Sequence, residues 1–115
     1  MNMEVAKRIL ESTGMTVDGA WNGREAVSLF DRAPAGTYQA ILMDVLMPEL
    51  DGYQATRAIR ACAHSEGATI PIIAMTADAF TENVAEAYAA GMSDHIAKPI
   101  DIELLFKTLR KYIPG

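Results

Sequence analysis

The sequence has little of what several functional classes require. Its 115 residues contain one cysteine, Cys62, which excludes an internal disulfide and a metal site built from clustered cysteines. A single thiol is typical of a reducing compartment, so we expect a cytoplasmic protein. The ten lysines and arginines are scattered along the chain and form no basic patch, so we expect no direct contact with nucleic acid.

Long apolar runs and phosphate-binding loops are also missing. No stretch approaches the roughly 18 apolar residues that would cross a membrane, so we expect no membrane contact by this domain. The opening carries Glu4, Lys7 and Arg8 where a signal peptide would be apolar. A glycine-rich loop of the kind that cradles nucleotide phosphates is absent as well, which disfavours a nucleotide-binding enzyme.

The residues that are present indicate one globular α/β domain over 1–115. Half of them are hydrophobic, 22% are charged and the net charge is −5. Patterns of helical and strand spacing alternate along the chain without a repeat or linker. We predict strands at 16–21, 40–43, 70–75 and 95–98. We predict helices before Gly14, from Asn22 to Pro34, at 53–63, at 81–90 and after Pro99.

Two of the predicted strands are apolar at almost every position. Such strands are buried on both faces, as in a parallel sheet between two layers of helices. We therefore predict an open, doubly wound α/β fold. In this architecture ligands bind at the carboxyl ends of the strands, where Asp44, Thr76 and Lys98 stand.

These three residue types suit a phosphoryl group attached to a carboxylate. Asp44 could act as the nucleophile and form an aspartyl phosphate. Thr76 could donate a hydrogen bond to a phosphoryl oxygen, and Lys98 could offset the charge of that group. The hypothesis depends on all three positions meeting at one edge of the sheet.

Three segments at these positions, 43–52 (MDVLMPELDG), 74–77 (AMTA) and 97–100 (AKPI), resemble the conserved segments of response-regulator receiver domains in two-component systems. The resemblance covers essentially the whole chain and is greatest for receivers of hybrid sensor histidine kinases. It implies a flavodoxin-like receiver fold. It also implies two-component phosphorelay signalling, with a histidine kinase or a phosphotransfer domain as partner and no turnover activity of its own.

The resemblance also implies a role for each site residue. Asp44 is then the phosphoacceptor, Thr76 the switch hydroxyl and Lys98 the phosphate-binding lysine. The peptide bond before Pro99 is expected to be cis, a state that proline makes accessible. The backbone carbonyl of Leu46 is expected to bind Mg²⁺ together with Asp44.

Two departures from the family pattern change these expectations. His95 occupies the switch position where the family usually has Tyr or Phe, which puts output through that side chain in doubt. The first strand of the family, with the acidic pair that binds magnesium, has no counterpart, so the metal site is incomplete and we expect weak or absent Mg²⁺ binding and slow phosphorylation.

The missing strand leaves two hypotheses for the sheet. Either another chain fills the gap, as in a strand-completing or swapped homodimer, or the strands ending at Trp21 and Asp44 pair directly. We also predict that His64 lies exposed in a polar loop without a ligand role.

Two other functions remain as alternatives. A degenerate receiver would be a protein-interaction module without phosphorylation, and the missing acidic pair favours it. A metal-dependent phosphatase of similar architecture is disfavoured, because Leu46 stands where a second acid would be needed two residues after Asp44.

Overall fold

The computed structural model describes residues 3–20, 22–44, 51–76, 82–97 and 100–113. Within these ranges helices and strands alternate after two initial helices. The elements are α1 (Met3–Ser12), α2 (Gly23–Arg32), β1 (Ile41–Asp44), α3 (Gly52–Ala61), β2 (Ile72–Thr76), α4 (Glu82–Ala90), β3 (Asp94–Ala97) and α5 (Ile102–Tyr112). None of the helices in these ranges has the length and apolar character needed to cross a membrane.

The three strands form a parallel sheet in the order β1-β2-β3. The backbone N–H of Ile41 donates to the carbonyl of Pro71 at 2.9 Å, and Ile41 pairs with Ile72. On the other side of β2, Ile73 pairs with Asp94. All three strands therefore run in the same direction, and their carboxyl ends lie at one edge of the sheet.

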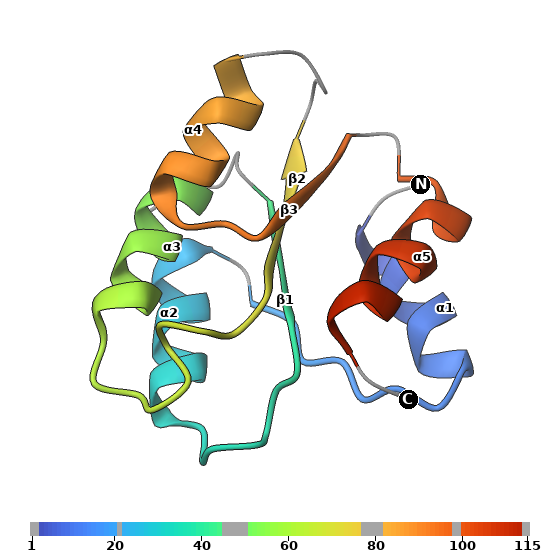
Figure 1. Ribbon diagram of the computed structural model, residues 1–115. Helices are drawn as coiled ribbons and strands as arrows, with labels where there is room; N and C mark the ends of the chain where they lie inside the picture. The colour runs from blue at the N-terminus through green and yellow to red at the C-terminus, as the bar shows by residue number, and fades with distance from the viewer. Residues whose placement is uncertain (1–2, 21, 45–50, 77–81, 98–99, 114–115) are drawn as a thin grey trace.

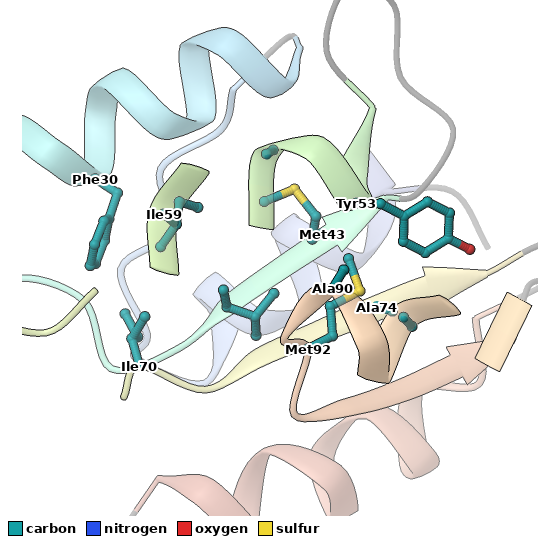
Figure 2. Packing of buried hydrophobic residues seen from close by; sticks show 11 residues of the cluster. Phe30, Met43, Tyr53, Ile59, Ile70, Ala74, Ala90 and Met92 are labelled. Carbon is teal, nitrogen blue, oxygen red and sulfur yellow. The ribbon is translucent and has the colours of Figure 1, made fainter. Parts of the chain in front are cut away.

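Helices cover both faces of this sheet, with α2, α3 and α4 on one side and α1 and α5 on the other (Figure 1). The side chains of β2 alternate between the two layers, so that Ile72 and Ala74 pack with the first layer and Ile73 and Met75 with the second. All four are fully buried. Figure 2 shows the first of these cores, in which Met43 from the sheet lies among residues of several helices. The predicted α/β architecture is confirmed.

The helix ends follow local sequence signals. Asn22 accepts a hydrogen bond from the backbone N–H of Glu25 at 2.8 Å, and Asp51 forms a reciprocal capping box with Gln54. Gly14 and Gly91, which follow α1 and α4, adopt φ of 94° and 107°. This left-handed conformation is easy for glycine and strained for other residues. The helix ends predicted at Gly14 and Asn22 are therefore confirmed.

The strand predicted at 16–21 is wrong for the residues described, because 15–20 form neither helix nor strand. Trp21 lies outside the described residues. A strand forms only where a neighbour can share its hydrogen bonds, and within the described ranges β1 pairs with β2 alone. The hypothesis that the strands ending at Trp21 and Asp44 pair directly is therefore also wrong for the described residues. A side-chain hydrogen bond of 2.7 Å, from the Tyr38 hydroxyl to Asp18, holds the segment beside the residues that lead into β1.

His64 was expected to be exposed but is half-buried and bridges two elements. Its ring lies against Phe30 of α2, with 4.3 Å between the ring centroids. Nδ1 accepts from the backbone N–H of Glu66 at 3.0 Å, so Nε2 carries the proton and donates to the carbonyl of Ala33 at 2.8 Å. The imidazole thus connects the end of α2 to the turn after α3.

Arg60 connects α3 to the starts of both β2 and β3. Its guanidinium donates to the carbonyl oxygens of Gly67, Ile70 and Gly91 at 3.1, 2.7 and 2.9 Å, and reaches the Ser93 hydroxyl at 3.4 Å. These carbonyls belong to the turns that precede the two strands. The guanidinium therefore holds both turns against the end of one helix.

We predict that Arg60→Met lowers the free energy of unfolding by about 2–3 kcal/mol, because hydrogen bonds to a charged group are lost and half-buried carbonyls are left without a donor. Urea denaturation followed by circular dichroism measures the change. Arg57→Met is the matched control, since Arg57 is exposed one turn earlier on α3. An equal loss in the two variants would contradict this role of Arg60.

Candidate functional site

The candidate site lies at the carboxyl edge of the sheet. Asp44 is the last residue of β1 and pairs with Met75, which directly precedes Thr76. Thr76 ends β2 and pairs with Ala97, the last residue of β3. The backbone therefore brings the end of β1 beside the end of β2, and the end of β2 beside the residue that precedes Lys98.

Four of the predicted features lie outside the described part of the structure. These are the Thr76 and Lys98 side chains, the peptide bond before Pro99 and the carbonyl of Leu46. Their roles, and the cis state of that peptide bond, stay predictions. The proximity of positions 44 and 76 does not depend on them, because it follows from the strand register alone.

Asp44 is presented by a strand that is anchored in both cores. Met43, which is 2% exposed, packs with the α2–α3–α4 layer, whereas Leu42 packs against the opposite one. Asp44 follows them at the end of the strand and is half-buried. A carboxylate on a rigid strand end, partly open to solvent, is suited to meet a group delivered by another molecule.

The described residues do not make a complete magnesium site. Within the described ranges, no group of three or more His, Cys, Asp or Glu residues could hold a metal ion. Mg²⁺ prefers near-octahedral oxygen coordination, with one or two carboxylates and several waters. Asp44 is one possible ligand, and the predicted second one, the Leu46 carbonyl, lies outside these ranges.

His95, the predicted switch position, makes a polar contact with α4. His95 lies on β3 and is half-buried, and its Nδ1 is 3.2 Å from the hydroxyl of Tyr88. The two rings meet edge to face with 5.9 Å between their centroids. Tyr88 is exposed on α4, so a rotation of the imidazole would change the surface of that helix.

Asp94, next to His95 on β3, has a lowered pKa. Burial by itself would raise the pKa of Asp94, but hydrogen bonds from the His95 backbone N–H and the Tyr112 hydroxyl, together with the Lys111 charge, outweigh it and lower the pKa. The Asp94 side chain is 16% exposed. Because Tyr112 and Lys111 belong to α5, their contacts with the Asp94 carboxylate tie the start of β3 to the end of α5.

Comparison with known proteins agrees with this geometry. Residues 1–110 match the family model for the response regulator receiver domain. The chain belongs to this family. The prediction from the three sequence segments is thus confirmed.

Relatives of this receiver domain include signalling proteins that are much longer. It is 42% identical to the two-component system protein A of Emericella nidulans, over 97% of this chain and 16% of that protein. It is 32% identical to the hybrid signal transduction histidine kinase L of Dictyostelium discoideum, over 97% of this chain and 7% of that protein. The expected similarity to receivers of hybrid histidine kinases is confirmed.

A solved structure with the same fold is the receiver domain of a sensor histidine kinase from Pseudomonas aeruginosa PAO1. It shares 39% identity with this domain at a TM-score of 0.86, with 99% of this chain and 89% of that chain covered. That protein holds a magnesium ion in its active site cleft.

We predict that Asp94→Asn lowers the free energy of unfolding at pH 7 by about 1 kcal/mol, because the charged hydrogen bonds are weakened. The folded-state pKa is depressed, so the stabilisation by Asp94 is present above the ordinary value of 3.8 and is lost as the pH falls below it. The difference between the two proteins should therefore become smaller as the pH is lowered from 7 toward 3 in urea denaturation. A difference that is the same at both pH values would contradict the assignment.

Proposed function

We propose that this receiver domain accepts a phosphoryl group on Asp44 from a histidine kinase or a phosphotransfer domain. The observation that carries the proposal is the parallel register, which brings the strand ends at positions 44 and 76 to one edge of the sheet. Membership of the receiver family supports it. The proposal concerns phosphoryl acceptance and not turnover of a substrate.

The transfer is a displacement at phosphorus. A carboxylate oxygen of Asp44 attacks the phosphorus of a phosphohistidine, and an O–P bond forms as the N–P bond breaks. The electron pair of that bond returns to the imidazole, which takes up a proton from water. The Thr76 hydroxyl donates to a phosphoryl oxygen, and the Lys98 ammonium offsets the charge of the acyl phosphate.

Magnesium would supply further charge neutralisation at the phosphoryl group. Because no group of three or more His, Cys, Asp or Glu side chains in the described ranges could hold a metal ion, we propose that magnesium binds weakly. Phosphorylation is then slow.

The wider role follows from the relatives. This domain spans 16% or less of the two signalling proteins to which it was compared. We propose that it works in the cytoplasm as a module of a phosphorelay. The surfaces formed by 85–90 of α4 and 104–112 of α5 would pass on the signal, with His95 at the switch position.

A degenerate receiver is the second candidate. It would bind its partner without phosphorylation, and the incomplete metal site among the described residues favours it. The two candidates differ in one measurable property, which is whether Asp44 takes up a phosphoryl group.

We predict that acetyl phosphate slowly adds one phosphoryl group to the wild-type chain. Intact-mass spectrometry should show the addition, and peptide mapping after borohydride reduction should locate it at Asp44. Asp44→Asn, which keeps the shape but removes the nucleophile, should take up none. No labelling of the wild type at saturating donor would support the degenerate receiver instead.

The matched control is Asp101→Asn. Asp101 caps α5 through its Oδ1, and asparagine is an equally good N-cap, so this variant should fold and become labelled as the wild type does. Loss of labelling in both variants would mean that Asp44→Asn acts through the fold and not through the nucleophile.

We further predict that magnesium binds weakly. Isothermal titration calorimetry should show saturation only at magnesium concentrations far above that of the protein, and labelling of Asp44 should increase little on adding the metal. Tight, stoichiometric binding with strong acceleration of labelling would contradict the incomplete site.

A further inference from the structure

A cluster of titratable side chains joins β3 to the helices on its two sides, α4 and α5 (Figure 1). Nδ1 of His95 lies 3.2 Å from the hydroxyl of Tyr88 on α4 and 3.9 Å from Oδ1 of Asp94. The other carboxylate oxygen of Asp94 accepts from the Tyr112 hydroxyl at 3.1 Å and from Lys111 Nζ at 3.5 Å, both on α5. The imidazole therefore stands between a hydroxyl on one helix and a carboxylate that is tied to the other.

The imidazole and the hydroxyl are both open to solvent. Ile96 packs with the α1–α5 layer, so His95, one residue earlier on the strand, faces the layer that contains α4. The His95 side chain is 29% exposed, and Tyr88 is 47% exposed. Water therefore reaches the pair, and the imidazole can exchange its proton with solvent.

The direction of the hydrogen bond between the two side chains depends on the proton at Nδ1. An imidazole ordinarily changes its charge between pH 5 and 8. Without a proton, Nδ1 of His95 accepts from the Tyr88 O–H. In the imidazolium both ring nitrogens carry protons and neither can accept, so Nδ1 donates to the Tyr88 oxygen and the O–H turns to solvent.

The surrounding groups provide a partner for His95 in either state. Burial by itself would raise the pKa of Asp94, but its hydrogen bonds and the Lys111 charge lower it, so this carboxylate stays charged at neutral pH. Burial and Asp94 raise the pKa of Tyr112, which is therefore neutral there. On β2, His95 pairs with Ala74, which carries no charge. The imidazolium thus has a carboxylate nearby whose charge Lys111 offsets in part, and the neutral ring has the Tyr88 hydroxyl.

We propose that His95 and Tyr88 form a proton-dependent contact, in which protonation of the imidazole reverses their hydrogen bond and frees the Tyr88 O–H on the surface of α4. Protonation also adds a positive charge beside that hydroxyl. The surface of α4 then offers a free donor and a cation at low pH, and neither at high pH. The contact does not require phosphorylation of Asp44, so the proposal is tested on the unphosphorylated chain and stands or fails separately from phosphoryl transfer.

The first experiment is an NMR titration of the isotope-labelled wild-type chain from about pH 8 to about pH 5.5. The nitrogen signals of His95 should show Nδ1 without a proton at the upper pH and with one at the lower. The ring carbons of Tyr88 should shift with the same midpoint as His95. Constant Tyr88 signals, or an Nδ1 that already carries a proton at pH 8, would overturn the proposal.

Tyr38 and His64 provide internal references for this titration. The Tyr38 hydroxyl donates to Asp18 and precedes β1, so its ring should not follow His95. In His95→Phe the ring contact with Tyr88 is kept and the titrating group is lost, whereas His64 remains. The Tyr88 signals should become independent of pH in this variant. A Tyr88 titration that persists would come from another group and would overturn the assignment to His95.

A double-mutant cycle measures the contact itself. Wild type, His95→Phe, Tyr88→Phe and the double variant are unfolded with urea at about pH 5.5 and about pH 8. All four keep two aromatic rings, so the cycle isolates the hydrogen bond. The coupling should be about twice as large at the lower pH, because a bond from a charged donor is roughly twice as strong as a neutral one. Equal coupling at both pH values would overturn the proposal, and circular dichroism verifies that each variant is folded.

Discussion

The hydrogen bonds that join β2 to β1 on one side and to β3 on the other run through the most deeply buried part of the molecule. The side chains of β2 alternate between two apolar layers, and helices from both ends of the sequence cover them. In a parallel sheet this pairing also aligns the strand ends. The candidate site at positions 44 and 76 is therefore a consequence of the same register that holds the core together.

Contacts between distant parts of the chain keep that register in place. Arg60 holds the turns before β2 and β3, and Asp94 ties the start of β3 to α5. His64 joins the end of α2 to the turn after α3. These polar contacts are mostly at the amino end of the sheet. The candidate site lies at the opposite, carboxyl end of the sheet. Open α/β domains bind their ligands at that end.

The strand at 16–21 and the exposure of His64 were predicted wrongly for the same reason. Thr16 to Ala20 have a pattern that suits a strand, but a strand requires a hydrogen-bonded neighbour, and none of the described segments supplies one. His64 stands among polar residues, yet its partners Phe30 and Ala33 lie far away along the chain. Neither outcome has a signal within a short window of sequence.

The sequence by itself determined the helices, their caps and the apolar strands, because these depend on residues within one or two turns of each other. It also placed Asp44 and Thr76 directly at strand ends and carried enough of the receiver pattern to identify the family. Only the tertiary structure decided that β1 keeps one edge unpaired among the described residues and that His95 of β3 meets Tyr88 of α4. Strand pairing and helix layering are long-range interactions, and their outcome depends on which segments are present to share hydrogen bonds and apolar surface.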